Sequence, residues 1–470
     1  MTCKPNIIWI MADDLSWGDL GCYGQKLIST PNIDRLAEEG MRFTSCYSGS
    51  TVCAPSRSCL MQGLHSGHAS VRDNMVRFEG GFYRPCLTEQ DTTVAQVVRE
   101  VGYATGVFGK WGLSVPGQPG LPNSKGFDEF FGYLNQRHAH SYYPPFLYHN
   151  YEKIEIPDNF GHDHLKPNEY DESGRIIPNG CAGPNPKYSF DLYAEKSLEF
   201  VRRNADRPFF LYLAYTIPHG VHEVPELGRY KDEPWPLVHR IYAAMVTRMD
   251  AAIGDLLNLL TELGLDQNTL IFFTTDNGYS AGGAAKDPSL DDVFHHRGPF
   301  KGEKGNLYQG GVRVPAIAWW PGRIKAGAVS THPWAFWDFL PTAAELAGAR
   351  IPEPCDGISI LPTLFGCESD QREHDYFYWE FGNQQAARLG CWWAYRPNPR
   401  SSIEIYHAED DPAHERDLSS EKPDVVRQAE RVFQEAHVPN PQSPSPGETY
   451  EHWIQRCREA GVELVNNVDW

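Results

Sequence analysis

The sequence predicts an α/β fold around a large, mostly parallel sheet, followed by a smaller α+β domain at the C-terminal end. Strand-like apolar runs alternate with helical patterns through most of the 470 residues, as expected of strand–helix–strand units. After about Gly366 the pattern changes to several short strand-like runs and one helical stretch. The length suggests more than one domain, and an apolar content of 41% is ample for a core.

The elements of the first part follow in a regular order. Thr30-Pro31 and Gly40 bound the first helix, Gly102 follows the second, and Gly264 ends a long fourth helix. Continuous apolar runs predict strands buried on both faces. The expected strands are 7–12, 104–108, 209–215, 269–275 and 314–320, and the expected helices are 32–39, 92–101, 190–203 and 237–263.

The last hundred residues predict a separate small domain and an extension. Short strands are expected at 374–380, 392–396 and 403–407, with a helix at 423–436. Residues 439–446 are rich in Pro and Ser, which predicts an extended tether, and 448–465 form a weakly helical pattern. The predicted division is a large domain at 1–366, an α+β domain at 367–438, and a tether with a C-terminal extension at 439–470.

Charge and cysteine usage restrict the class of protein. A net charge of −19 disfavours non-specific nucleic-acid binding. Because the overall charge also repels an anionic substrate, such a substrate needs a local cluster of basic side chains. Eleven scattered cysteines without a CxxC motif fit reduced thiols better than a disulfide framework. No apolar run is long enough to span a bilayer, and no signal peptide precedes the first strand. As written, the chain is expected to be cytoplasmic; removal of a leader from a periplasmic or secreted protein leaves the same pattern.

Polar residues follow three of the predicted strands. Asp13-Asp14, Lys110 and Asp276-Asn277 stand at or beyond strand ends, where open α/β sheets place their active sites. The oxygen side chains of the two pairs suit a hard cation such as calcium or magnesium. Zinc is less suited because no Cys/His set has ligand spacing. Each pair alone also fits a turn or a helix cap.

Cys53-Ala54-Pro55-Ser56-Arg57 is the most informative stretch of the chain. A cysteine there can be a small buried hydrophobe at the start of a helix. It can also be a thiolate nucleophile beside an oxyanion-binding arginine, although thiolate phosphatases place more residues between Cys and Arg. The order Cys-x-Pro-x-Arg resembles the signature of the formylglycine sulfatases.

The resemblance to that family extends over much of the chain. Similar motifs occur in the expected order at 5–14, 30–37, 109–111, 218–219, 275–278, 304 and 310–315, with further similarity at 405–406 and 410–412. It implies a type I sulfatase with an alkaline-phosphatase-like sandwich fold. It also implies a maturation partner, the formylglycine-generating enzyme, which oxidises the cysteine to an aldehyde.

The resemblance implies a role for each matching residue. Cys53, as formylglycine hydrate, would be the nucleophile and a metal ligand, and Arg57 would hold the hydrate. Lys110 and Lys304 would neutralise sulfate oxygens, and His219 would lie at the bridging oxygen. The calcium ligands, with magnesium as the other option, would be Asp13, Asp14, Cys53, Asp276 and Asn277.

The chain departs from the family pattern at Gly112, where a histidine that assists the second hydroxyl is usual. Residues 136–144 hold two histidines, an arginine and two tyrosines, which suggests a pocket for a sugar sulfate. His140 is the expected replacement and sugar contact, and His138 is the next choice; one histidine can instead be structural. Arg72 is a further candidate for substrate binding.

These observations predict a sulfatase that cleaves a sulfate monoester of a carbohydrate, with a galactose or N-acetylgalactosamine sulfate as the expected unit. Two alternatives stay open. One is a phosphodiesterase or phosphonate monoester hydrolase of the same superfamily, since the site suits either tetrahedral anion. The other is a non-catalytic sulfoglycan-binding protein whose Cys53 is never oxidised. The sequence does not indicate the oligomeric state.

Overall fold

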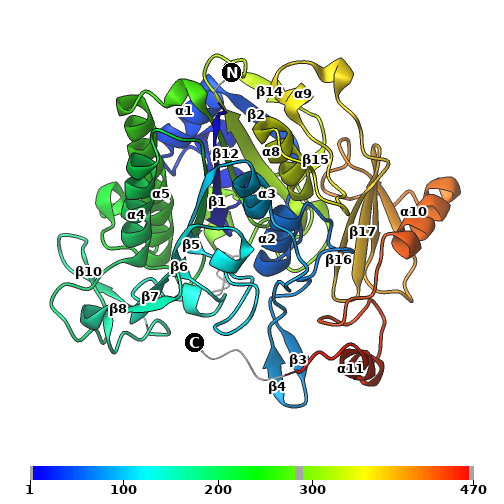
Figure 1. The fold of residues 1–470 in the computed structure, drawn as a ribbon, viewed down its shortest axis with the longest axis horizontal. Coiled ribbons are helices and arrows are strands. Elements are labelled where there is room, and N and C mark those ends of the chain that lie inside the picture. Colours follow the sequence, from blue (N-terminus) through cyan, green and yellow to red (C-terminus); the bar gives the residue numbers. More distant parts are fainter. Residues whose placement is uncertain (1–3, 167, 281–288, 465–470) are drawn as a thin grey trace.

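The computed structural model describes residues 4–166, 168–280 and 289–464, and a large sheet between two helical layers forms its centre (Figure 1). Five adjacent strands, β12, β1, β11, β5 and β6, run parallel, and both flanks contain antiparallel pairs. The predicted α/β fold with a mostly parallel sheet is therefore confirmed. In spatial order the strands are β14 (Ala328–Ser330), β2 (Met41–Tyr47), β13 (Arg313–Trp319), β12 (Thr269–Thr275), β1 (Asn6–Asp13), β11 (Phe209–Pro218), β5 (Ala104–Lys110), β6 (Glu129–Tyr133), β7 (Phe146–His149) and β8 (Glu152–Glu155), and β15 (Trp334–Ala335) also pairs with β2.

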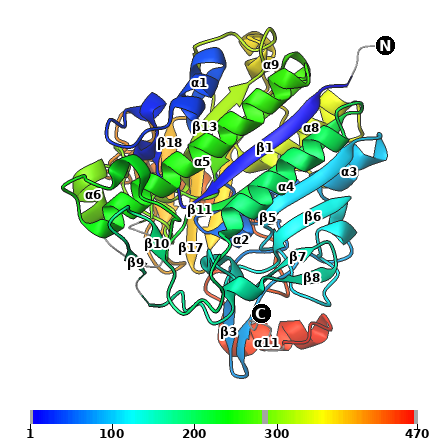
Figure 2. The same ribbon diagram turned by 90° about the vertical axis from the view of Figure 1, so that its left-hand side faces the viewer.

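The central strand β1 is buried along its whole length and feeds both layers of the core. Ile8 and Ile10 pack into the layer of α1, α4 and α5, and Ile7 and Trp9 pack into the layer of α2, α3 and α8. Figure 2 shows α4 and α5 lying across the first of these faces. The helices are α1 (Pro31–Glu39), α4 (Ser189–Arg203) and α5 (Leu237–Glu262) on one face, and α2 (Cys53–Gln62), α3 (Val94–Glu100) and α8 (Phe339–Ala347) on the other.

A second, antiparallel sheet of four strands follows the large one in sequence. Its strands are β16 (Phe377–Phe381), β17 (Gln384–Leu389), β18 (Trp392–Arg396) and β19 (Glu404–His407), and α10 (Pro423–Glu435) packs on one face. The other face joins the large sheet through stacked and tilted rings of Tyr47, Trp337, Trp379 and Trp393. This aromatic contact fixes the small sheet against the main body, while the predicted domain boundaries stay a prediction.

The Pro- and Ser-rich segment, predicted to be an extended tether, is docked on the main body. The Asn440 amide donates to the Ser70 carbonyl at 2.8 Å, and the Gln442 side chain accepts from and donates to the Cys86 backbone at 2.9 Å. Beyond it, Trp453 of α11 (Tyr450–Glu459) is buried beside Val76. Satisfied backbone groups and an apolar anchor therefore hold the segment in place.

Shorter elements complete the described chain. They are β3 (Val76–Phe78), β4 (Gly81–Tyr83), β9 (Glu169–Tyr170), β10 (Ile176–Ile177), α6 (Ser289–Phe294), α7 (Gln309–Val312) and α9 (Leu361–Leu364). Within the described ranges, every helix is too short or too polar to span a bilayer.

Candidate active site

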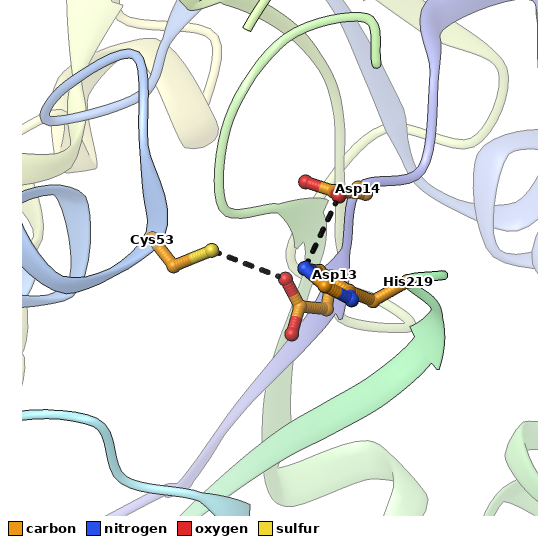
Figure 3. Close-up of side chains that lie close together, drawn as sticks. All are labelled: Asp13, Asp14, Cys53 and His219. Atoms are coloured by element: carbon orange, nitrogen blue, oxygen red, sulfur yellow. Dashed lines mark hydrogen bonds and ion pairs between the residues drawn. The ribbon is translucent and has the colours of Figure 1, made fainter. Parts of the chain in front are cut away.

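Cys53 is the first residue of α2 and points toward the end of β1 (Figure 3). Its Sγ lies 3.4 Å from Oδ1 of Asp13 and 3.5 Å from Nζ of Lys304. The side chain is enclosed, with 1% of the residue exposed. The cysteine singled out by the sequence thus lies between a carboxylate and an ammonium group.

Two parallel strands bring the acidic pairs together. Ala12 of β1 lies opposite Thr275 of β12, so the residues that follow each strand arrive side by side. The Asp14 backbone N–H donates to Asp276 Oδ1 at 3.3 Å, and Asn277 Nδ2 donates to Asp14 Oδ1 at 2.8 Å. Asp14 has a φ of 64°, a left-handed conformation that aspartate tolerates better than most residues, and it turns the chain directly after β1.

Three basic side chains face these carboxylates. Nζ of Lys110, at the end of β5, lies 2.6 Å from Asp13 Oδ2, and Nζ of Lys304 lies 2.5 Å from Asp14 Oδ1. Arg57 donates from Nη2 to Asp276 Oδ2 at 2.9 Å and from Nη1 to the Lys110 carbonyl at 2.8 Å. Buried charges are costly unless paired, so the three cations and three carboxylates stabilise one another.

The donor atoms of this group fit a metal ion. Asp14 Oδ2 and Asn277 Oδ1 are both buried, and neither has a hydrogen-bond partner among the described residues. Ligand atoms of Asp13, Asp14, Cys53 and His219 also lie within 4.8 Å of one another. A concentration of carboxylate and amide oxygens with unused lone pairs suits a hard divalent cation. The ligand set expected from the sequence does not contain His219.

The surroundings of Cys53 keep its sulfur protonated. Burial raises the pKa of the Cys53 thiol well above its ordinary value, and the carboxylates of Asp13 and Asp276 raise it further. Because the thiolate is the nucleophilic form, a thiolate phosphatase would need the opposite shift. In the absence of a bound cation, these surroundings therefore favour the thiol over the thiolate of an unmodified Cys53.

His219 stands just beyond β11 with its ring at the acidic group. Its Nε2 lies 3.5 Å from Asp14 Oδ2, and Nδ1 faces the carbonyl of Gly220. Burial lowers the pKa of His219 to about 3, against the opposing effect of Asp14. The imidazole is therefore neutral near pH 7 until an anion or a proton source changes its surroundings.

His140 lies beside His219, at the site that the sequence suggested for it. The two imidazoles stack with centroids 4.4 Å apart and planes 21° apart. The Tyr142 hydroxyl fastens this loop to the end of β11, because it lies 2.7 Å from the carbonyls of Thr216 and His219. The loop thus presents one partly buried histidine to the acidic group.

Two other candidates are not brought to this group. His138 is 1% exposed, and its ring packs against Tyr133 and Phe146, with centroids 4.9 and 4.3 Å away. Arg72 is also buried, and it donates to Glu380 Oε1 at 2.7 Å and to the Ala69 carbonyl at 2.9 Å. The structure thus places both residues in packing contacts outside the group around Cys53, and their predicted role in substrate binding stays a prediction.

Arg72→Ala is therefore expected to lower stability rather than turnover. The change removes the guanidinium at Glu380 Oε1 and, among the described residues, leaves only His437, at Oε2, as a basic partner of this buried carboxylate. Breaking a buried pair costs about 3–5 kcal/mol. Urea unfolding followed by fluorescence measures the loss, and kcat/KM of the folded fraction should stay within about twofold. A large fall in kcat/KM with unchanged stability would instead indicate that Arg72 binds substrate.

Tyr212 and Thr51, which belong to no sequence motif, help to hold the basic side chains of Arg57 and Lys304 in place. Arg57 Nη1 lies 3.4 Å from the hydroxyl of Tyr212, which is buried in β11. Thr51 Oγ1 accepts from the Gly305 backbone N–H at 2.9 Å and so ties the Lys304 turn to the Cys53 turn. Both contacts join segments more than 150 residues apart, and no local pattern marks such residues.

Comparison with known proteins gives consistent matches. The family model described as Sulfatase matches residues 5–349. N-acetylgalactosamine-6-sulfatase of Canis lupus familiaris is 33% identical over 401 residues, covering 82% of this chain and 70% of that protein. Arylsulfatase A of Homo sapiens is 35% identical over 397 residues, covering 80% and 70%. The crystal structure of Ps i-CgsB in complex with k-i-k-neocarrahexaose superposes with a TM-score of 0.73 at 27% identity, covering 97% of this chain and 98% of that one.

Proposed function

This chain belongs to the sulfatase family and is a sulfuric ester hydrolase, and on that premise we propose that it acts on a sulfated carbohydrate through a formylglycine at position 53. The observation that carries the proposal is the setting of Cys53. Its Sγ lies between Asp13 and Lys304, where a nucleophile is expected, yet the raised pKa of the thiol withholds the thiolate. Oxidation by a formylglycine-generating enzyme would replace the sulfur with an aldehyde, whose hydrate supplies hydroxyl groups.

The ligands of a metal ion in this proposal are Asp13, Asp14, Asp276 and Asn277, together with the oxygen at position 53. Calcium is the proposed ion and magnesium the alternative, because all of these donors are oxygens. A bound divalent cation would lower the pKa of the hydroxyl group at position 53. Lys110 and Lys304, which contact Asp13 and Asp14, would neutralise the sulfate oxygens.

The reaction then has two steps. One hydroxyl group of the hydrate loses its proton to solvent and its oxygen forms a bond to sulfur, the bond from sulfur to the ester oxygen breaks, and the departing alcohol takes up a proton. In the second step the other hydroxyl loses its proton, the carbonyl re-forms, and the carbon–oxygen bond to sulfate breaks. Water restores the hydrate.

His219 is the proposed donor of the proton to the departing alcohol. A neutral ring must first take up a proton, and the negative charge of a bound sulfate ester favours this. Arg57 would hold the hydrate, and its bond to Asp276 keeps the guanidinium oriented.

The proposed substrate is a sulfated galactose or N-acetylgalactosamine unit. The similarity to a protein named N-acetylgalactosamine-6-sulfatase supports this sugar class. The test is a screen of defined sulfated saccharides, with an aryl sulfate and an aryl phosphate diester in parallel and intact mass to verify the aldehyde. Faster hydrolysis of the phosphate diester would favour the phosphodiesterase alternative. Absence of conversion in the native host would favour the binding protein.

His140→Ala is expected to lower kcat/KM at least tenfold while leaving metal content unchanged. The stacked ring of His140 fixes the orientation of His219, and acid–base groups contribute about 10²–10⁴-fold. Steady-state kinetics and elemental analysis measure the two quantities. His149→Ala, which changes a partly exposed histidine on β7, is the matched control. If His140→Ala is as active as this control, His140 has no role in turnover.

A further inference from the structure

Gln136 lies directly against the α-carbon of Gly112. A Cβ placed on Gly112 would lie 2.3 Å from Gln136 Nε2, 3.1 Å from Cδ and 3.6 Å from Oε1. Side-chain carbons do not approach other atoms as closely as 2.3 Å, so the amide occupies the space that any side chain at position 112 would enter. Gly112 also has a φ of +76°, which glycine adopts without strain.

The backbone holds the two residues together just beyond the carboxyl ends of β5 and β6. The pairing of β5 with β6 continues beyond both strands, because Trp111 N donates to Tyr133 O at 2.9 Å and Gly112 N donates to Leu134 O at 3.0 Å. Lys110, two residues before Gly112, reaches Asp13 at 2.6 Å. Gln136 therefore enters at the same sheet edge as the proposed catalytic residues.

The amide of Gln136 has an unused acceptor. The residue is only 5% exposed, and its Oε1 is buried without a hydrogen-bond partner among the described residues. Its Nε2 makes one long contact of 3.4 Å, to the Gly112 carbonyl. A buried amide oxygen without a donor is costly, which indicates that a donor arrives with a ligand or modification.

We propose that Gln136 Oε1 accepts a hydrogen bond from a hydroxyl group during turnover. The inference rests on the proposed function, which offers two sources of hydroxyl: the hydrate at position 53 and the sugar of the substrate. A neutral amide neither gains nor loses a proton near pH 7, so Gln136 orients the hydroxyl and does not act as a general base. His140 lies instead on His219, so the two loop residues serve different positions.

Gln136→Leu removes the acceptor and keeps a side chain of similar size. We expect kcat/KM to fall about tenfold, the effect of one lost hydrogen bond in a dry site. An equal fall for an aryl sulfate and a sulfated saccharide assigns the hydrate as donor, and a fall for the saccharide alone assigns the sugar. Unchanged kinetics with both substrates overturn the proposal.

Gly112→Ala tests the same contact from the other side. Its methyl group would displace the amide, so it should lower kcat/KM as much as Gln136→Leu, and it should add little in a Gln136→Ala background. Gly264→Ala is the control, because Gly264 has a similar φ of +67° with nothing near its Cβ position. An equal effect of Gly112→Ala in both backgrounds would contradict a role for Gln136.

The variant Cys53→Ala tests the proposed function separately from the role of Gln136. Cys53→Ala is assayed in the same series, with thermal melting of every variant to verify folding. If Cys53→Ala hydrolyses the aryl sulfate as fast as the unmutated protein, the formylglycine proposal and the inference that rests on it both fail. If Cys53→Ala is inactive and every Gln136 variant is fully active, the inference alone fails.

Discussion

Cys53→Ala is expected to abolish sulfate ester hydrolysis while leaving the fold intact. The nucleophile is removed entirely, and losses of about 10⁴-fold or more follow when a covalent catalyst loses its nucleophile. The fold should tolerate the change, because among the described residues the Sγ makes two polar contacts, both long, to Asp13 and Lys304. Hydrolysis of an aryl sulfate and intact mass measure the loss.

The chain offers a close control on the same helix. Cys59 is also fully buried in α2, and its Sγ lies 3.4 Å from the Gly49 carbonyl. Cys59→Ala should therefore keep its activity and show the same conversion at position 53 as the unmutated protein. Activity of Cys53→Ala within a few-fold of Cys59→Ala would contradict the formylglycine proposal.

Asp276→Ala is expected to remove both the metal ion and the activity. It deletes one carboxylate of the proposed ligand group and leaves Arg57 without its 2.9 Å partner. Hard cations depend on the number of charged oxygen ligands, so metal content should fall together with kcat. Elemental analysis, activity, and the effect of a chelator on the unmutated enzyme measure these changes.

Asp250→Ala separates the loss of a ligand from the loss of any buried carboxylate. Asp250 is 2% exposed and accepts from the backbone N–H groups of Asn32 and Ile33 at 2.9 and 2.8 Å, at the start of α1. Its removal should lower stability and leave the metal content unchanged. Full activity of Asp276→Ala without bound metal, or a site that holds zinc, would be inconsistent with the proposed ligand set.

The sequence predicts the strands that are buried on both faces, because these appear as unbroken apolar runs. The run at 269–275 matches β12 at both ends. β17 was missed because Gln384-Gln385-Ala386-Ala387-Arg388 contains no β-branched or aromatic residue, and its strand character comes from pairing with β16 and β18. The acidic pairs could be predicted to meet because both follow parallel central strands.

Side-chain direction within a loop could not be predicted in the same way. His138 and His140 lie in one short turn, and only the three-dimensional path sends one ring to Phe146 and the other to His219. The pairing of Arg72 with Glu380 could not be predicted either, because the two residues are 308 positions apart. Nor could the sequence predict that the Gln136 amide lies against Gly112, because this contact depends on the path of the loop.

On the proposed route, the register of β1 also limits the time available for the modification of Cys53. Ala12 pairs with Thr275, so the ends of β1 and β12 cannot meet around Cys53 until that residue has been synthesised. At about 5–20 residues per second, synthesis of the roughly 220 residues from Cys53 to Thr275 takes about 11–44 s. In the folded chain Cys53 is 1% exposed and out of reach of a second protein. On the proposed route, chains that miss this interval fold around an unmodified thiol, and later supply of the modifying enzyme does not rescue them.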